Sequence, residues 1–192
     1  MTKVVVPFAG STGKTRLDAP QRTRRELSLA MLADVLAAAA PVGEPLVVTA
    51  DPDGAALAGE LGGETFADPG GGQGAAVAAA LAALREAPVL VVNADLPCAV
   101  PADLRALLAA VPEHGIALVE ALDGTTNALG LSSPALFAPV YGPDSARRFH
   151  ALGAETVSVA IPNLAEDVDT LADLERLQLR CGPRTQACLA RA

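Results

Sequence analysis

The sequence predicts an α/β protein with a mostly parallel, buried central sheet. Short apolar runs rich in Val alternate along the chain with longer stretches rich in Ala and Leu. Strands separated by helices of this length are typical of parallel β-α-β units, whose sheets are covered on both faces. Because 51% of the residues are hydrophobic and only 3% are aromatic, the core must be built from Ala, Val and Leu.

The alternation of strands and helices continues regularly to about residue 120. We expect strands at "KVVVPF", "PLVVTA", "ETFA", "PVLVVN" and "GIALVE", with helices between them at Gln21 to Ala40, Gly54 to Leu61, Gly74 to Glu86 and Pro101 to Val111. After a turn at Asp123-Gly124 the rhythm changes. We then expect a helix around Ser145 to Leu152, a strand at "TVSVAI", a helix from Thr170 to Arg180 and a short helix starting at Pro183.

One domain is expected to span residues 1–192. A chain of this length can bury one core well, whereas a second independent core would be cramped. The net charge is -8 and the pI about 4.7, which argues against general binding to nucleic acid or to an anionic membrane, because both need a basic surface. An anionic ligand would therefore require a local group of cationic side chains or metal ions.

A cytoplasmic protein is expected from the targeting and cysteine patterns. The apolar run that follows the first residues is too short for a secretory signal, and no cleavage-like segment follows it. The longest apolar tract, Leu27 to Val42, is interrupted by Asp34 and falls short of the ~20 residues that span a membrane. The three cysteines, Cys98, Cys181 and Cys188, do not make a disulfide framework and fit a reducing compartment.

The loop "PFAGSTGKTRL" after the first strand partly matches a phosphate-binding P-loop. A true P-loop would place its first glycine at position 8, which is Phe8. Gly10 stands only three residues before Gly13, so the shorter loop cannot wrap a β-phosphate in the same way. The loop still offers exposed amides together with Lys14 and Arg16, which could lie along a triphosphate. The alternative is an ordinary turn with solvated basic side chains.

Two acidic motifs indicate a divalent-metal site. In "VLVVNADLP" a hydrophobic strand delivers Asp95 to the carboxyl edge of the sheet, where a carboxylate is well placed to hold Mg2+ on nucleotide phosphates. In "EDVDT", Asp167 and Asp169 project to one side of an extended segment while Val168 turns toward the core. Two such carboxylates repel unless a cation lies between them. The alternative for Asp95 is that it caps the helix near Pro101, although Asp103 is the nearer capping residue. The alternative for the second motif is that Asp169 or Thr170 caps the following helix.

Two further segments are candidates for anion binding. The glycine run "DPGGGQG", which ends in Gln73-Gly74, lies between a strand and a helix, where α/β proteins place ligand loops. In "YGPDSARRFH", Ser145 and the first amides of a helix could bind a carboxylate or phosphate, with Arg147, Arg148 and His150 adding charge nearby. A capped helix with a solvated basic face remains the alternative for this segment.

In order and spacing, these motifs resemble one family. "GKTRL", "NADLP", "GTTNAL", "YGPDS", "DVDT" and the tail "CGPRTQACLA" are similar to those of the guanylyltransferases of coenzyme F-420 biosynthesis. The resemblance covers nearly the whole chain. It implies a three-layer, Rossmann-like nucleotidyltransferase fold, shared with enzymes that activate sugars and molybdopterin.

The resemblance also implies roles for individual residues. Three aspartates of the family hold metal ions, which correspond here to Asp95, Asp167 and Asp169 with Mg2+ as the cofactor. Its acceptor-binding threonine, glycine and serine correspond to Thr126, Gly142 and Ser145. The nucleotide side would comprise Gly10, Gly13, Lys14 and Gln73, with Lys14 and Arg16 stabilising the triphosphate as pyrophosphate leaves.

The reaction implied is transfer of GMP from GTP to the phosphate of a three-carbon acid, with release of pyrophosphate. The Ala-rich sequence and the tail resemble the actinobacterial branch, for which phosphoenolpyruvate is the expected acceptor. 2-Phospho-L-lactate and 3-phosphoglycerate differ from it by a few atoms and stay open. A downstream transferase that receives the unstable product would be a further partner.

Two other functions remain open at this stage. A P-loop-like small-molecule kinase would use Lys14 as its phosphate lysine and "VLVVNAD" as its metal-binding strand. A non-catalytic nucleotide-sensing protein would have kept the fold and lost turnover. Its supporting features are Phe8 and Gly74, because family members usually carry a lysine at the first position and an asparagine near the second.

Overall fold

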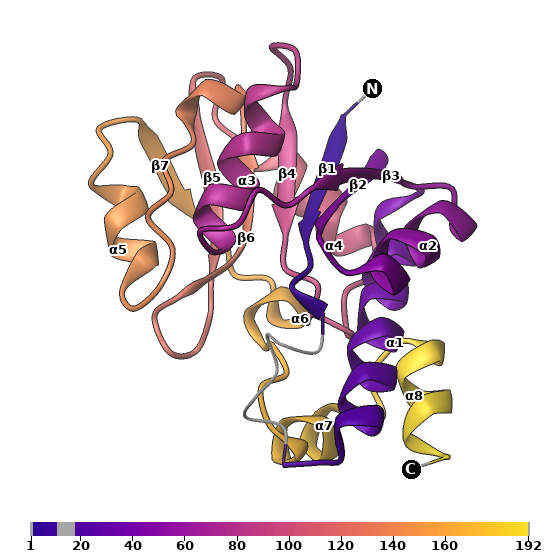
Figure 1. Ribbon diagram of the computed structural model, residues 1–192. Coiled ribbons are helices and arrows are strands. Elements are labelled where there is room, and N and C mark those ends of the chain that lie inside the picture. The colour runs from indigo at the N-terminus through magenta and orange to yellow at the C-terminus, as the bar shows by residue number, and fades with distance from the viewer. Residues whose placement is uncertain (1, 11–17, 192) are drawn as a thin grey trace.

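The computed structural model describes residues 2–10 and 18–191. Its strands are β1 (Lys3–Pro7), β2 (Glu44–Thr49), β3 (Glu64–Ala67), β4 (Val89–Val92), β5 (Gly115–Glu120), β6 (Thr126–Leu131) and β7 (Glu155–Ser158). Among the described residues they form one seven-stranded sheet in the order β3-β2-β1-β4-β6-β5-β7 (Figure 1). All pairings are parallel except the two made by β6, which runs opposite to both of its neighbours. The predicted mostly parallel sheet is therefore confirmed.

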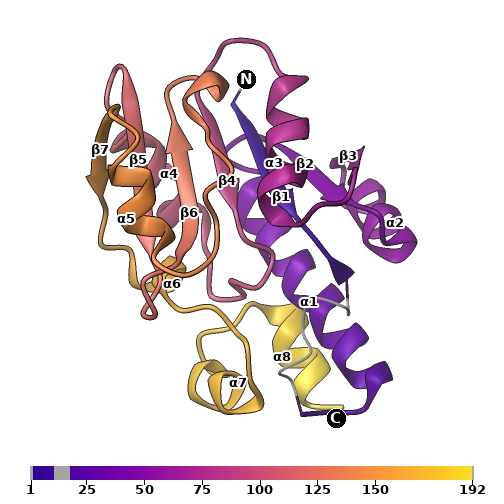
Figure 2. The same ribbon diagram turned by 60° about the vertical axis from the view of Figure 1, so that its left-hand side comes forward.

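Helices cover both faces of the sheet. They are α1 (Gln21–Ala39), α2 (Pro52–Glu60), α3 (Gln73–Ala82), α4 (Pro101–Ala109), α5 (Ser145–His150), α6 (Pro162–Ala165), α7 (Leu171–Leu177) and α8 (Pro183–Leu189), with a 3-10 turn η2 (Pro134–Leu136). Side chains of α1, α2, α4 and α6 pack on one face, and those of α3 and α5 on the other. Three layers result, as Figure 2 shows.

Strand β1 explains how two cores form. Its central residues Val4, Val5 and Val6 are fully buried, and successive side chains of a strand point to opposite faces. Val4 and Val6 belong to the core under α1, α2 and α4, while Val5 belongs to the core under α3 and α5. The continuous valine run thus identifies a strand covered on both faces.

The reversed strand β6 is the main departure from the regular pattern that the sequence predicted. It forms a hairpin with β5, and the side chain of Asp123 in the turn accepts hydrogen bonds from the backbone N–H and the hydroxyl of Thr125. Because β6 runs backwards, its first residue, Thr126, lies at the edge where the parallel strands end. There the N–H of Asn93, just after β4, donates to the carbonyl oxygen of Asn127 at 3.0 Å.

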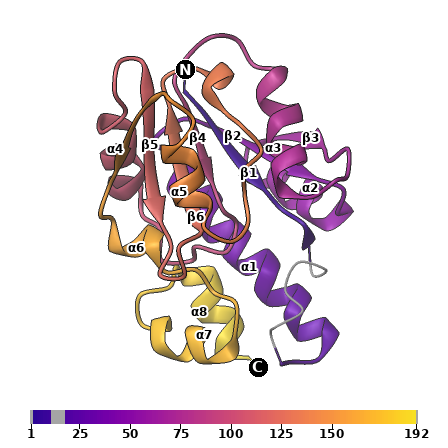
Figure 3. The same ribbon diagram turned by 90° about the vertical axis from the view of Figure 1, so that its left-hand side faces the viewer.

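Helices α7 and α8 lie beyond the carboxyl edge of the sheet, beside the N-terminal half of α1 (Figure 3). The buried carboxylate of Asp34, in α1, accepts hydrogen bonds from the N–H groups of Arg184 and Thr185 at 3.1 and 2.8 Å. It thereby satisfies the free amides at the start of α8. Gly182 permits this approach, because a Cβ there would lie 2.3 Å from Cγ of Asp34.

Element ends differ from the sequence prediction by a few residues, and α6 was not foreseen. α3 ends at Ala82 rather than Glu86, β7 lies at Glu155–Ser158 rather than over "TVSVAI", and α7 covers only Leu171–Leu177. The expected cap of α4 is present, because Asp103 accepts a hydrogen bond from the N–H of Val100 at 3.0 Å.

Among the described residues, no helix combines the length and the apolar character that a membrane span requires.

Candidate functional site

A pocket of about 240 Å³ opens at the carboxyl ends of β1 and β4. Gly10 and Gln73, both predicted to bind nucleotide, line it, together with Asn93, Asp95 and Asp169. This is the place where open α/β sheets bind their ligands. Gly13, Lys14 and Arg16, which were predicted to contact the triphosphate, belong to residues 11–17 and lie outside the described residues.

The glycine run predicted to be a ligand loop forms one wall of this pocket. Gly70, Gly71 and Gly72 all have φ between 84° and 90°, a conformation that only glycine adopts readily. The carboxylate of Asp68 accepts a hydrogen bond from the N–H of Gly70 at 2.8 Å, and Gly72 leads directly into α3. Asp68, Gly72 and Gln73 of this run line the pocket, so the loop presents bare backbone to it at Gly72.

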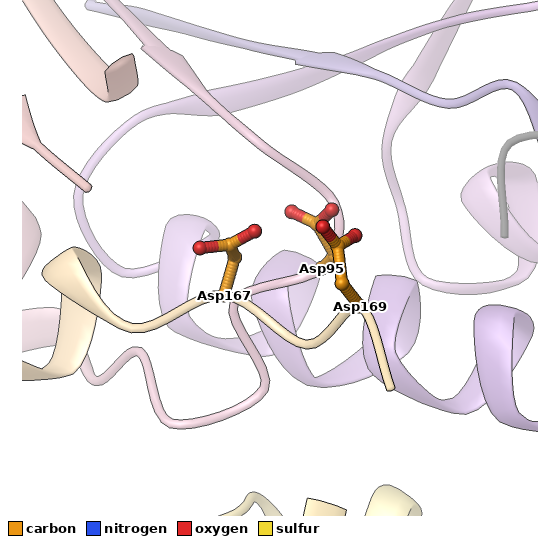
Figure 4. A group of neighbouring side chains, drawn as sticks. All are labelled: Asp95, Asp167 and Asp169. Carbon is orange, nitrogen blue, oxygen red and sulfur yellow. The ribbon is translucent and has the colours of Figure 1, made fainter. Parts of the chain in front are cut away.

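The three predicted metal ligands come together beside the pocket. Asp95, Asp167 and Asp169 each offer a carboxylate oxygen within 4.8 Å of the others, and all three side chains project to the same side of the two segments that carry them (Figure 4). Val168 between the two later aspartates is fully buried, as the alternation of an extended segment predicted. The geometry therefore gathers three oxygen ligands from two distant parts of the chain.

Backbone hydrogen bonds fix this arrangement. The N–H of Val168 donates to the carbonyl oxygen of Asp95 at 3.1 Å, so the two segments run side by side. The helix that follows is capped by Thr170 and Asp173: the Thr170 side chain accepts from the N–H of Asp173, and the Asp173 carboxylate accepts from the N–H of Thr170. The capping role that was left open between Asp169 and Thr170 thus belongs to Thr170.

The electrostatics of the group reflect crowded negative charge. Burial, and then the nearby charge of Asp95, raise the pKa of Asp167 above its ordinary value, and Asp169 adds to this. A hydrogen bond from Asn127 acts in the opposite direction. Like charges held this close favour either a proton or a cation between them.

Amide side chains connect the carboxylates to the pocket, and two of them, Asn93 and Asn127, were not predicted from the sequence. Asn127 donates from Nδ2 to Oδ1 of Asp167 at 3.3 Å. Asn93 donates from Nδ2 to Oδ1 of Asn127 at 3.4 Å, and Gln73 donates from Nε2 to Oδ1 of Asn93 at 2.7 Å. The sequence feature that could have pointed to them is their place at strand ends, since Asn93 directly follows β4 and Asn127 stands near the start of β6.

The three predicted acceptor residues also meet. Ser145 donates its hydroxyl to Oγ1 of Thr126 at 3.0 Å, and its N–H donates to the carbonyl oxygen of Gly142 at 3.0 Å. Gly142 has a φ of 107°, which only glycine adopts easily. Ser145 is 0% and Thr126 2% exposed, so both hydroxyls are buried and the Ser145 hydroxyl proton is already engaged by Thr126.

Charge near this group comes from Arg148. Its guanidinium donates to the carbonyl oxygens of Tyr141 and Pro143 at 3.1 and 2.6 Å, and lies 3.5 Å from the place where a β-carbon of Gly142 would be. Arg147 is exposed, and His150 shares a hydrogen bond with Ser158 at 2.9 Å. Of the three expected cationic groups, Arg148 is the one whose contacts tie it to the loop of Gly142.

The two positions that depart from the family pattern have structural explanations. Phe8 is buried in the core under α2, and a β-carbon at Gly54 would lie 2.5 Å from its ring. The absence of a side chain at Gly54 therefore makes room for the phenyl ring. At Gly74, a β-carbon would come within 3.0 Å of Pro139, so α3 approaches the segment before the Gly142 loop closely.

Comparison with known proteins assigns the class. The family model described as the MobA-like NTP transferase domain matches residues 15–174, and the chain belongs to this family. A solved structure of a nucleotidyl transferase from Methanothermobacter superposes with a TM-score of 0.70 at 19% identity, covering 100% of this chain and 99% of that one. The predicted nucleotidyltransferase fold is confirmed.

Within that class, two curated relatives that share one name are similar to this chain at higher sequence identity. A protein of Nocardia farcinica named phosphoenolpyruvate guanylyltransferase is 42% identical over 86% of this chain and 79% of its own length. A protein of the same name from Streptomyces coelicolor is 38% identical over 99% of this chain and 96% of its own length. The predicted resemblance to guanylyltransferases is confirmed.

Proposed function

We propose that this chain transfers the GMP moiety of GTP to the phosphate of phosphoenolpyruvate and releases pyrophosphate. The observation that carries the proposal is the likeness, over nearly the whole chain, to two proteins named for that activity. The pocket at the carboxyl edge of the sheet, with three carboxylates beside it, supports the proposal independently.

The chemistry suits the side chains that are present. A phosphate monoester has a second pKa of about 6, so the acceptor is mostly dianionic near neutral pH and needs no general base. One of its oxygens attacks the α-phosphorus of GTP, and the bond from that phosphorus to the oxygen bridging to the β-phosphate breaks. The protein must align two highly charged reactants and neutralise their charge.

We further propose Mg2+ as the cofactor, held by Asp95, Asp167 and Asp169. The donor set fits this ion, because all three ligands are carboxylate oxygens gathered within 4.8 Å and Mg2+ prefers hard oxygen ligands. A bound Mg2+ supplies positive charge to the phosphate oxygens of both reactants. The pocket that Asp95 and Asp169 line is where those phosphates would lie.

The nucleotide would occupy this pocket between Gly10 and Gln73. Gly10, with a φ of 65°, lies so close to Asp51 that a β-carbon would come within 2.3 Å of its Oδ2. The chain can therefore turn tightly there, directly before residues 11–17, which include Gly13, Lys14 and Arg16. In this proposal the two cations stabilise the triphosphate while negative charge moves to the departing pyrophosphate.

The acceptor would lie across the pocket, at the group of Thr126, Gly142 and Ser145. Thr126 accepts from Ser145 and keeps its own O–H free of that bond to donate to a phosphate or carboxylate, whereas Ser145 can donate to one only after it releases Thr126. Arg148 stands beside Gly142. Thr126 is adjacent in sequence to Asn127, which contacts Asp167. An acceptor held there would therefore lie near the metal group.

The biological setting follows as part of the same proposal. A product in which an enolpyruvyl group is linked to guanosine through a diphosphate fits coenzyme F-420 biosynthesis, in the cytoplasm. Such a reactive product would be taken up by a downstream transferase.

The testing experiment is mass spectrometry of the products formed with Mg2+, GTP and each of three acceptors: phosphoenolpyruvate, 2-phospho-L-lactate and 3-phosphoglycerate. ATP in place of GTP is the matched nucleotide control. We expect pyrophosphate and a product in which GMP is joined to the phosphate of phosphoenolpyruvate. GDP with a phosphorylated product would instead identify a kinase, and nucleotide binding without any product would identify a sensor.

A further inference from the structure

A run of three side-chain amides leads from the nucleotide pocket to the metal group. It consists of Gln73, Asn93 and Asn127, and it ends on the carboxylate of Asp167. Gln73 and Asn93 line the pocket, whereas Asn127 is 2% exposed. Buried amides are kept only when their polar atoms are satisfied, and those of Asn127 are satisfied by Asn93 on one side and Asp167 on the other.

The direction of donation along this run is set at two points. An ionised carboxylate only accepts hydrogen bonds, so Asn127 must present its NH2 group to Asp167 and its oxygen to Asn93. A backbone carbonyl also only accepts, and Nδ2 of Asn93 lies 3.4 Å from the carbonyl oxygen of Thr126. Asn93 therefore turns its own oxygen toward Gln73. Each amide fixes the orientation of the next.

The reversed strand makes this geometry possible. Asn93 directly follows β4 and Asn127 is the second residue of β6, and these strands pair in antiparallel fashion with Val92 opposite Ala128. The N–H of Asn93 donates to the backbone carbonyl oxygen of Asn127 at 3.0 Å. Backbone and side-chain bonds together leave Asn127 little freedom to turn away from Asp167.

We propose that Asn127 is a positioning residue that holds the carboxylate of Asp167 in its metal-binding orientation, and that Asn93 and Gln73 hold Asn127 in turn. The inference rests on the proposed function, because it takes the three aspartates as the metal ligands. Substitution of a residue that hydrogen-bonds to a metal ligand and orients it typically weakens metal affinity by 10- to 100-fold. The effect of removing an amide should diminish with its distance from Asp167 along the run.

The test is Mn2+ binding, followed by electron paramagnetic resonance, with no nucleotide or acceptor present. We expect Asn127→Ala to weaken Mn2+ binding by ~10-fold or more, Asn93→Ala by less, and Gln73→Ala least. Asn127→Leu has a similar size but cannot donate, so it should bind Mn2+ as weakly as Asn127→Ala. Native affinity in Asn127→Leu would mean that Asn127 only fills space, and would overturn the proposal.

The matched control is Asn163→Ala. Asn163 donates from Nδ2 to Oδ2 of Asp103 at 3.0 Å, the same type of bond at a carboxylate outside the metal group. The Asn163→Ala substitution should leave Mn2+ affinity unchanged, even if it lowers the melting temperature of the protein. If Asn127→Ala does not fold, Asn93→Ala carries the test, and native Mn2+ affinity in that variant would contradict the inference.

The Mn2+ measurement is independent of the reaction. Graded loss of Mn2+ affinity in a protein that makes no guanosine adduct would support the role of Asn127 and refute the proposed function. Guanosine transfer by the unaltered protein, together with unchanged Mn2+ affinity in Asn127→Ala and Asn127→Leu, would support the proposed function and refute the role of Asn127. Absence of Mn2+ binding by the unaltered protein would overturn the inference about Asn127 directly.

Discussion

The N–H of Val168 donates to the carbonyl oxygen of Asp95 across 3.1 Å, and this bond ties the two segments that supply the predicted metal ligands. One segment follows β4 and the other precedes α7. Because the bond is made by the backbone, substitution of the aspartate side chains should leave it intact. Loss of function in such variants can therefore be separated from loss of fold.

Asp95→Asn and Asp169→Asn should each reduce kcat by ~100-fold or more, because each removes a negative ligand from a metal that stabilises transferring phosphates. The measurement is the initial rate of pyrophosphate release with Mg2+, GTP and acceptor, alongside circular dichroism of each variant. Glu166→Gln is the control, since Glu166 stands in the same segment but pairs with Arg176 and Arg180. Activity near the native level in both aspartate variants would exclude the metal assignment.

Mg2+ should raise the melting temperature of the unaltered protein, since a ligand that binds only the folded state stabilises it by mass action. Asp169→Asn should lose most of this increment. The measurement is thermal unfolding after treatment with a chelator, repeated with Mg2+ and with Na+ at equal ionic strength. An equal increment in the two proteins would show that the stabilising ion binds elsewhere.

Asp167→Asn should stabilise the metal-free protein, because it removes one of three crowded negative charges. The raised pKa of Asp167 means that its ionised form costs folding free energy. This cost is fully present above the folded pKa, decreases as the pH falls below it, and is absent below the unfolded pKa. Asparagine removes the charge and still accepts from Asn127. Urea unfolding in the presence of a chelator, near neutral pH, measures the difference. A less stable variant would contradict the crowded-charge interpretation.

Ser145→Ala should raise the KM for the acceptor by ~10-fold, the usual weight of a hydrogen bond to a charged group, and leave the KM for GTP unchanged. Thr126 loses its partner in this variant, so a loss of about 1 kcal/mol in stability is also expected. Ser132→Ala is the control, because Ser132 follows the far end of β6 and accepts from the N–H of Gly115. An unchanged acceptor KM would remove Ser145 from the acceptor site.

Asp34→Ala should destabilise the protein by about 1–2 kcal/mol, since it removes the acceptor for two amides at the start of α8. Glu26→Ala, on the same helix, should cost less than about 0.5 kcal/mol, because the pair that Glu26 makes with Arg22 is exposed. Urea unfolding of the two variants compares them. Equal losses would show that capping by Asp34 is not the reason for its burial.

The parallel strands and the metal ligands could be predicted from the sequence because their patterns are local. A run such as Val4 to Val6 is long enough to show a buried strand, and the spacing of Asp167 and Asp169 fixes which way they point in an extended segment. Both predictions needed only the geometry of one element. The structure brings the two segments together through the backbone hydrogen bond from Val168 to Asp95.

The amides of Asn93 and Asn127 could not be predicted in the same way. Their meeting depends on β6 running backwards, and an apolar run such as "TNALGL" carries no information about strand direction. The turn at Asp123-Gly124 could be predicted from the sequence, but the antiparallel pairing of β6 with its two neighbours could not. Likewise, the hydrogen bond between Ser145 and Thr126 depends on tertiary packing. The roles assigned to Lys14 and Arg16 stay predictions.

The docking of α8 onto α1 joins residues 150 positions apart in the chain, Asp34 and Arg184. Contacts that close so long a loop form late, because the entropy of closure must be overcome before they contribute. Until α8 is in place, the apolar side chains of Leu27 and Met31, which pack in the cluster that includes Cys188 of α8, lack part of their cover. Folding intermediates with exposed apolar helices aggregate readily. The docking of α8 thus limits how early in folding the apolar face of α1 is protected from aggregation.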